Sequence, residues 1–106
     1  MRVEEYLRPD GSSPWRRWFD GLSPEAAAKV AIALFRLGQG HRSNLKWIGR
    51  IGEYRIDWGP GYRIYLIQDG TDLILLLGGG TKHRQPADIE RARKLRAEHQ
   101  RRKGTR

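Results

Sequence analysis

A short segment near the middle of the chain, EYRIDWGPGYRIYLI at positions 53–67, constrains the fold more than any other. Large apolar residues alternate with charged ones on both sides of a Gly-Pro-Gly sequence, as they do in two half-buried strands joined by a tight turn. One register gives the pair an entirely apolar face, and it sets three pairs opposite one another: Trp58 and Tyr62, Ile56 and Ile64, and Tyr54 and Leu66. We therefore predict a β-hairpin in this register with residues 59–61 as its loop, because a shift of one residue would mix the two faces.

The other face of this hairpin carries both of its arginines, Arg55 and Arg63. One interpretation is ordinary cross-strand stabilisation, in which Arg63 pairs with Asp57 directly across and Arg55 stacks on Tyr65. The other is that this sheet face is uncovered and that the two guanidinium groups form a phosphate-binding floor. The planar donor fork of arginine suits that purpose better than the ammonium group of lysine.

Two Ser-Pro sequences upstream of the hairpin predict two helices. Ser13 and Ser23 are each placed to cap the unpaired amides of a first turn, where the following proline needs no donor. The first helix is short, and the second extends to about Leu37 with Gly38 as its C′ residue. Its apolar stripe consists of Ala27, Val30, Ala31, Leu34 and Leu37. We expect this helical hairpin to cover the apolar face of the strands.

Further strands and a last helix complete the domain. Residues 2–7 read as a first strand, residues 39–52 as a mixed loop, and residues 72–77 as the third strand of the meander. The sequence LILLL in that strand does not alternate, as expected for a strand that is covered on both faces. Residues 87–98 read as the final helix. The order predicts an α+β domain with a mainly antiparallel four-stranded sheet, a helical hairpin and a C-terminal helix, with the helices on one face.

Length and charge narrow the functions that are open to the chain. At 106 residues it is long enough for one hydrophobic core, so we treat residues 1–106 as a single domain. Its net charge of +9 points to a polyanion such as nucleic acid, or to an acidic protein partner. Residues 91–106 hold eight basic residues and one acidic residue, and so carry +7 of this charge. They form either a solvated helix face or a contact to RNA phosphates, and we expect residues 100–106 to fray.

Several kinds of site and location are disfavoured. Cysteine is absent, which excludes disulfides and thiolate-bound zinc. No two carboxylates and no His/Asp group stand at ligand spacing, so we expect neither a metal site nor a cofactor. The N-terminus has no secretory apolar segment, and the longest apolar run, residues 73–77, is too short to span a bilayer. We therefore expect a cytoplasmic protein with no membrane partner.

The sequence EYRIDWGPGYRIYL, followed by LLLGGGTKHRQPADIERARKL, resembles the RelE/ParE superfamily of toxins from bacterial toxin-antitoxin modules. The nearest likeness is to its branch of HigB-like addiction module killer proteins, and it extends over nearly the whole chain. The resemblance implies a RelE-like fold in the order β-α-α-β-β-β-α. It also implies a small basic toxin of a type II module that arrests growth, most often by cutting mRNA in the ribosomal A site and so inhibiting translation.

The same resemblance implies partners. The toxin would act on mRNA at the ribosome, and a neighbouring gene would encode its antitoxin, a HigA-like helix-turn-helix protein in this branch. The toxin would reach operator DNA only through the antitoxin complex. Two alternatives remain open, because one fold serves several targets in this superfamily. They are a ParE-like DNA gyrase poison without nuclease activity and a non-catalytic RNA-binding protein.

The resemblance also places the site. Matched position by position, the basic residues of the family fall on Lys46, Arg55, Arg63 and Lys82, and Gln85 begins the last helix. We expect Arg55 and Arg63 to bind the phosphate and stabilise the transition state, and Lys82 to transfer a proton or orient the phosphate. These three are the expected catalytic residues of a metal-independent endoribonuclease. The residues expected to contact RNA are Lys46, Arg50, Tyr65, His83 and Gln85.

Two of these residues also have plainer interpretations. Lys82 follows three glycines, whose backbone can approach a phosphate closely, but a lysine there also fits a solvated turn. The sequence GGGTK lacks the spacing of a nucleotide-binding P-loop. Imidazole groups titrate near neutral pH, which makes His83 a candidate general acid or base. His83 equally fits a surface position, and it is not among the residues that the resemblance supplies.

Overall fold

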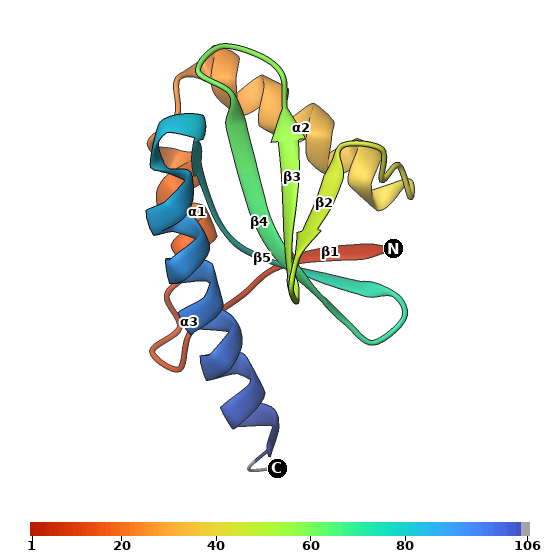
Figure 1. The fold of residues 1–106 in the computed structure, drawn as a ribbon, viewed down its shortest axis with the longest axis vertical. Helices are drawn as coiled ribbons and strands as arrows, with labels where there is room; N and C mark the ends of the chain where they lie inside the picture. The colour runs from red at the N-terminus through yellow and green to blue at the C-terminus, as the bar shows by residue number, and fades with distance from the viewer. Residues whose placement is uncertain (105–106) are drawn as a thin grey trace.

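In the computed structural model, which describes residues 1–104, a five-stranded mixed sheet carries helices on both faces (Figure 1). The elements in chain order are β1 Arg2–Glu5, α1 Pro14–Asp20, α2 Pro24–Gly38, β2 Leu45–Ile48, β3 Ile51–Ile56, β4 Tyr62–Asp69, β5 Leu73–Thr81, the short 3₁₀ turn η1 Lys82–Arg84, and α3 Gln85–Gly104. The strands lie in the order β1-β5-β4-β3-β2, with β1 parallel to β5 and every other pair antiparallel. The α+β class is confirmed, and the sheet has one strand more than predicted.

The additional strand is β2, which lies in the segment predicted to be a loop. It pairs antiparallel with β3, and only Gly49 and Arg50 separate the paired ends of the two strands. The φ of Gly49 is +61°, which suits the first central position of a type II′ turn, where glycine is favoured. With four residues, β2 is too short to display the alternation by which a strand is recognised in sequence.

The central hairpin of β3 and β4 has the predicted faces but a register that differs by two residues. Tyr54 lies opposite Ile64 rather than Leu66, so the loop spans residues 57–61. Within this loop Gly61 has a φ of +76°, and its amide donates to the carbonyl of Trp58 at 3.1 Å. A shift of two residues leaves every side chain on its original face. The predicted faces therefore survive, whereas the predicted cross-strand partners are wrong.

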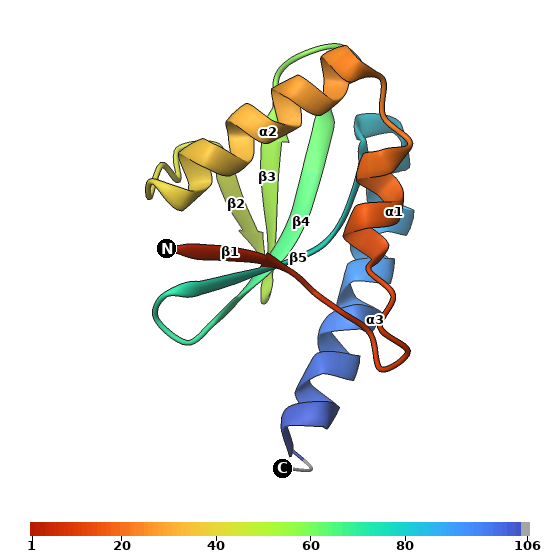
Figure 2. The ribbon, with the colours of Figure 1, turned by 180° about the vertical axis from the view of Figure 1, so that it is seen from behind.

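Helices α1 and α2 cover one face of the sheet, as predicted (Figure 2). Trp15 of α1 is buried, and Trp18 packs flat on β5 over Gly79, where a Cβ atom would come within 2.4 Å of the indole. The apolar cluster of this face contains ten buried residues: Trp15, Val30, Ala33, Leu37, Tyr54, Ile56, Ile64, Leu66, Ile74 and Leu76. This is the larger of the two parts of the core.

Both helices begin where the Ser-Pro sequences predict. The hydroxyl groups of Ser13 and Ser23 accept from the amides three residues further on. In α2, however, Ala31 is exposed although it was expected in the buried stripe, since the outer side of this helix is also apolar and blurs the pattern. Gly38 belongs to the helix, and the C′ position is taken by Gly40, whose φ is +90°.

Helix α3 lies on the opposite face of the sheet, so the prediction that all helices share one face is wrong (Figure 1). Ala92 and Leu95 of α3 pack against four residues of the sheet: Tyr65, Ile67, Leu75 and Leu77. The helix begins at Gln85 and continues through residue 104, so the expected fraying is wrong for residues 100–104, whereas residues 105 and 106 lie outside the described part. The face of the hairpin that carries the arginines is therefore covered.

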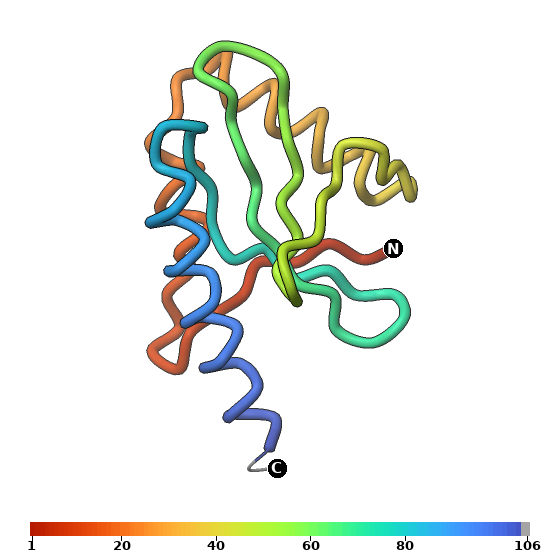
Figure 3. The backbone as a smooth tube through the Cα atoms, in the orientation of Figure 1, coloured from red at the N-terminus to blue at the C-terminus, as the bar shows by residue number. Residues whose placement is uncertain are grey.

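The strands β1 and β5 differ from their predicted lengths. β1 ends at Glu5, and β5 extends to Thr81, so the three glycines expected beyond the strand lie within it. β1 runs along only the first half of β5, where Glu5 lies opposite Leu76 (Figure 3). No helix within residues 1–104 is long and apolar enough to cross a membrane.

Candidate nucleic-acid interface

A fully buried carboxylate, Glu53, organises the region where β3 meets the start of α3. Its Oε1 accepts a hydrogen bond from Nε of Arg55 at 2.9 Å, and its Oε2 accepts from Nε2 of Gln85 at 2.6 Å. A buried charge is costly unless it is paired and hydrogen-bonded, and both oxygens of Glu53 are satisfied. Glu53 therefore ties the arginine of β3 to the first residue of α3.

Arg55 and Arg63 lie directly opposite each other on β3 and β4. Like charges in that position repel, and the carboxylate of Glu53 offsets this repulsion. The two arginines differ in access, because the side chain of Arg55 is 41% exposed whereas Arg63 is only 6% exposed. Within residues 1–104 the terminal nitrogens of Arg55 make no hydrogen bond, so they are available to an anion.

Arg63 is held by the hairpin loop. Its Nη1 donates to the carbonyl of Gly61 at 2.6 Å, while its buried Nε has no hydrogen-bond partner among the described residues. The expected pair with Asp57 does not form, because the shifted register places Arg55 opposite Arg63 and leaves Asp57 exposed in the loop. The expected stacking of Arg55 on a tyrosine of β4 is likewise not formed in the described part of the chain.

Lys82 reaches the same loop carbonyl from the end of β5. Its backbone amide donates to the Gly61 carbonyl at 2.9 Å, so that carbonyl accepts from both Arg63 and Lys82. The side chains of Lys82, His83 and Arg84 are all exposed in η1, immediately before α3. The end of β5 thus presents a group of cationic side chains beside the positive end of a helix dipole.

Tyr65 occupies the floor beneath α3. Its hydroxyl is shielded from solvent and makes no hydrogen bond of ordinary geometry within residues 1–104. Burial, followed by the nearby carboxylates of Glu53 and Asp88, raises the pKa of Tyr65 well above its usual range. Asp88, on α3, is 4% exposed, and its Oδ1 accepts from Arg91 at 3.0 Å. Tyr65 is thus a buried residue, out of reach of a surface-bound RNA in this conformation.

The two remaining RNA-contact candidates from the sequence lie on β2 and in the turn after it. Lys46 lies opposite Glu53 and is exposed, so it borders the same site. Arg50 lies at the far end of β3, about 17 Å from Arg55 at roughly 3.4 Å per residue of strand. It lines a separate hollow of about 300 Å³ that also includes Arg96 of α3. The structure therefore brings Lys46 to the site and leaves Arg50 outside it.

Two residues of the site were missed by sequence reasoning. Glu53 received no role, although a glutamate two positions before Arg55 on one strand shares its face. Asp88 gave no signal, because an acidic residue in the first turn of a helix is ordinary. Among residues 1–104, no group of three or more His, Asp or Glu side chains is arranged to hold a metal ion.

Comparison with known proteins identifies a relative. No protein-family model matches the sequence. A protein of Haemophilus influenzae, described as an uncharacterized protein, is 40% identical over 74 residues, which cover 69% of this chain and 75% of that protein. At this identity and coverage the two chains are homologous. The chain therefore belongs to the same protein family as this Haemophilus influenzae protein.

Proposed function

We propose that the protein is the toxin of a type II toxin-antitoxin module, a RelE/HigB-like endoribonuclease that cuts mRNA on the ribosome without a metal ion. One observation carries the proposal: residues matched to the superfamily pattern from separate elements are held by two hydrogen-bonded groups, whose arginines, Arg55 and Arg63, lie directly opposite each other. Glu53 holds Arg55 and Gln85. The Gly61 carbonyl holds Arg63 and Lys82.

Arg55 is suited to stabilise the charge that develops during cleavage. Metal-free cleavage proceeds by attack of the 2′-hydroxyl on the phosphate, and it needs donors around the phosphorane. The Nε–Glu53 bond fixes the guanidinium, while the terminal nitrogens remain available. In this proposal Arg55 binds the scissile phosphate through those two nitrogens, in the paired geometry that arginine makes with phosphate.

Lys82 is our candidate for proton transfer, with His83 beside it as a second candidate. Both side chains are exposed, and both precede a helix of 20 residues whose N-terminus favours a phosphate. The Lys82 backbone is tied to the hairpin loop, so its position relative to the strand that carries Arg55 is constrained. A fixed distance between a phosphate ligand and a proton donor is what such a reaction requires.

Arg63 is better placed to position the hairpin loop than to contact RNA directly. Its side chain is 6% exposed, and it donates to the same carbonyl that anchors the Lys82 amide. In this proposal Arg63 positions the loop and, through it, Lys82. A direct catalytic part for Arg63 stays a prediction.

The charge of the molecule supports an RNA target. Residues 91–106 carry +7 of the net charge of +9, and the exposed basic side chains of α3 include Arg93 and Lys94. Such a surface favours a polyanion as extended as ribosomal RNA. In this proposal the ribosome orients the mRNA, a HigA-like antitoxin from the neighbouring gene silences the toxin, and the protein acts in the cytoplasm.

Expression of the chain in a sensitive host, followed by mapping of mRNA 5′ ends, tests the proposal. We expect new 5′ ends with the wild type and about a 10²-fold loss of cleavage with Arg55→Gln, the usual effect of removing one transition-state donor. Lys82→Gln should have an effect of similar size. Arg36→Gln removes an equal charge from an exposed part of α2, on the other face of the sheet, and should change cleavage little.

The outcomes separate the alternatives. Intact transcripts together with gyrase-dependent DNA breaks would overturn the nuclease proposal in favour of a gyrase poison. Binding of RNA without cleavage by the wild type would indicate a non-catalytic RNA-binding protein. Cleavage that is equal in the wild type, Arg55→Gln and Lys82→Gln would show that the nuclease site lies elsewhere on the molecule.

A further inference from the structure

The second half of β5 has no strand neighbour on one side. β1 pairs with β5 only as far as Leu76, and the last bond between the two segments runs from the Tyr6 amide to the Leu76 carbonyl at 2.9 Å. From residue 78 to residue 81, β5 pairs with β4 alone within the described chain, and Leu77 lies at an irregularity in that pairing. A free strand edge offers backbone donors and acceptors to another chain, and proteins usually protect such edges.

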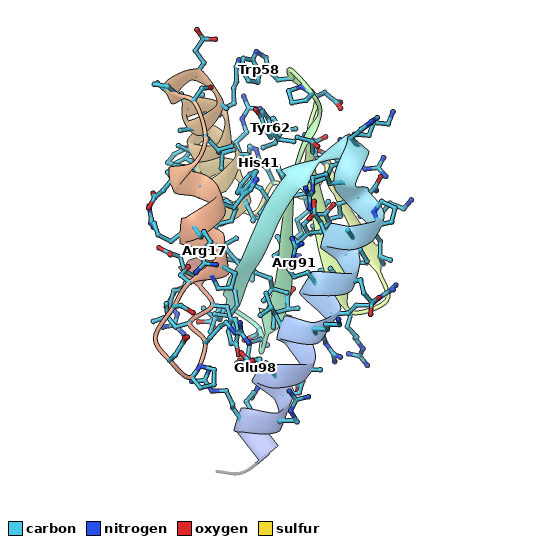
Figure 4. All side chains as sticks on the ribbon, turned by 90° about the vertical axis from the view of Figure 1, so that its left-hand side faces the viewer. Arg17, His41, Trp58, Tyr62, Arg91 and Glu98 are labelled. Carbon is cyan, nitrogen blue, oxygen red and sulfur yellow. The ribbon has the colours of Figure 1, made fainter. Side chains whose placement is uncertain are left out.

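A groove lies over this free edge, between α1 and α3. Figure 4 looks onto it, with α1 on one side, α3 on the other and β5 between them. The groove has a volume of about 520 Å³, and Gly78 and Gly79 are among the residues that line it. Trp18 and Leu95 give it apolar walls. Its volume is in the range of sites that hold a few side chains or a small ligand.

The three glycines at the end of β5 differ in the space beside them. A Cβ atom at Gly79 would strike the indole of Trp18, and one at Gly80 would strike the carboxylate of Asp88. A Cβ atom at Gly78 would meet no atom within 4 Å. The space at Gly78 is therefore unfilled, and this residue leaves the strand edge accessible from the groove.

The rim of the groove is positively charged. Arg8, Arg17 and Arg91 line it, against Asp10 and Asp88. Asp88 is buried and already paired with Arg91, and Asp10 accepts from the Ser12 hydroxyl at 2.6 Å. The exposed guanidinium of Arg17, by contrast, has no ion-pair partner within residues 1–104. In Figure 4 Arg17 and Arg91 come from the two helices that flank β5.

Two buried polar atoms lie in the lining as well. The Tyr65 hydroxyl and Oδ2 of Asp88 are both shielded and have no hydrogen-bond partner in the described part of the chain. Tyr65 is 1% exposed and Asp88 is 4% exposed. Unsatisfied buried polar atoms are uncommon in folded proteins and call for a specific explanation. A ligand that reached these two atoms from the groove would supply partners for them.

We propose that this groove binds an extended peptide segment with acidic side chains, which adds a strand to β5 at residues 77–81. The unpaired backbone supplies main-chain hydrogen bonds, the apolar walls receive one side chain, and Arg17, the one arginine of the rim without an ion pair among residues 1–104, receives a carboxylate. A second copy of this chain is the wrong occupant, since two copies at +9 each would repel. The groove lies on the α1 side of α3, whereas Arg55 and Lys46 lie toward the β2 edge; the added strand would end beside Lys82, at the margin of the proposed nuclease site.

Titration of the ¹⁵N-labelled full chain with defined peptides tests this proposal. The probe is acetyl-(Val-Glu)₃-amide, compared with the lysine analogue and with an acidic analogue N-methylated at alternate residues, which cannot complete a strand ladder. We expect saturable shifts of the amides of residues 77–81 with the acidic probe, and at least tenfold weaker binding of the other two. Equal binding of all three peptides, no binding of any, or shifts confined to other residues would overturn the proposal.

Two substitutions with matched controls sharpen the test. Gly78→Leu places a side chain in the groove at a position where a Cβ atom meets nothing within 4 Å, and it should weaken binding of the acidic peptide at least tenfold. Gly104→Leu, at a position where a Cβ atom also meets nothing within 4 Å, should leave binding unchanged. Arg17→Glu should weaken binding several-fold, whereas Arg101→Glu makes the same change of charge outside the groove and should not. Unchanged binding by Gly78→Leu, with an intact amide spectrum, would exclude the groove as the site.

Discussion

The two faces of the sheet are built in different ways. The face beneath α1 and α2 is packed with apolar side chains, and all ten buried members of its cluster are hydrophobic. The face beneath α3 has a smaller apolar cluster and, beside it, three buried charged residues: Glu53, Arg63 and Asp88. Burial of charged groups is unfavourable unless they are paired. The first face therefore supplies most of the stability, and the second uses part of its interior to hold charged groups in fixed positions.

The largest effect is expected on the apolar face. Trp15→Ala removes a side chain that is 2% exposed and packs against Trp18 and Phe19. We expect the free energy of unfolding to fall by about 3–5 kcal/mol, the usual cost for a large buried aromatic residue. Urea unfolding followed by circular dichroism measures it. Trp47→Ala, at a tryptophan that is 43% exposed, is the control and should cost far less. Equal losses would mean that the two faces do not differ as described.

A moderate effect is expected for Glu53→Gln on the α3 face. The amide retains one acceptor and presents an NH₂ group where the carboxylate now accepts from Arg55 and Gln85, so one of these bonds is lost. We expect a loss of about 1–3 kcal/mol in the free energy of unfolding. Glu90→Gln, at a side chain that is 60% exposed, provides the control. A neutral Glu53→Gln would show that the buried network does not hold α3 on the sheet.

The α3 face should also lose stability at high pH, because Tyr65 is buried there. Because the pKa of Tyr65 is raised in the folded state, its hydroxyl stays protonated there at a pH where the same tyrosine in the unfolded chain ionises, near the ordinary tyrosine pKa of about 10. The unfolded state then binds fewer protons, so stability is complete below pH 10 and falls as the pH rises beyond it. At pH 11 we expect Tyr65 to account for roughly 1 kcal/mol of the decrease in the free energy of unfolding.

Tyr65→Phe isolates this contribution. The variant should match the wild type near pH 7, because the hydroxyl that it removes has no hydrogen-bond partner in residues 1–104. It should then lose less stability than the wild type between pH 10 and pH 11. Urea titrations at the two pH values make the comparison. Parallel losses would indicate that Tyr65 becomes accessible to solvent at high pH.

The smallest effect is expected at the end of α3. Asp69 in β4 accepts from His99 at 3.0 Å and from Lys103 at 2.5 Å, and these partners, Lys103 first, lower the pKa of its carboxyl. Its contribution is present above the ordinary pKa of an aspartate and is lost as the pH falls through the lowered value. These groups are partly exposed, so Asp69→Asn should cost less than about 1 kcal/mol. Hydrogen exchange of the last turns of α3, compared between the wild type and Asp69→Asn at pH 6 and pH 3, would detect this loss. A difference between the two proteins that is larger at pH 3 than at pH 6 would contradict this assignment.

The contrast between the faces also explains what could be predicted from sequence. The capping serines Ser13 and Ser23 predict the starts of α1 and α2, and the alternation of apolar and charged residues alone predicts the two faces of the hairpin. Helix α3 does not reveal its buried side, because a few apolar residues such as Ala92 and Leu95 stand among many charged ones. The placement of α3 depends on tertiary contacts, and with it the burial of Arg63.

The candidate site was predictable to a similar degree. Arg55, Lys82 and Gln85 were identified in sequence. In the structure Glu53 holds Arg55 and Gln85, and the hairpin loop holds the backbone of Lys82. The pairing of Arg63 was not predictable, because the loop has five residues rather than three, and both lengths preserve the apolar face. The role of Glu53 could not be predicted from the sequence either, since this carboxylate is buried only because α3 covers it.

The contact between the first and last segments has a consequence for synthesis. Tyr6 donates to Glu98 at 2.7 Å across 92 positions of the chain, and β1 pairs with a strand that begins at Leu73. Such distant contacts are slow to form. On a translating ribosome, β1 emerges before the other elements and finds its partner strand only after residues 73–76 have emerged, and Tyr6 finds Glu98 later still. We therefore expect chains released before residue 98 to lack a closed fold and to be removed by proteases.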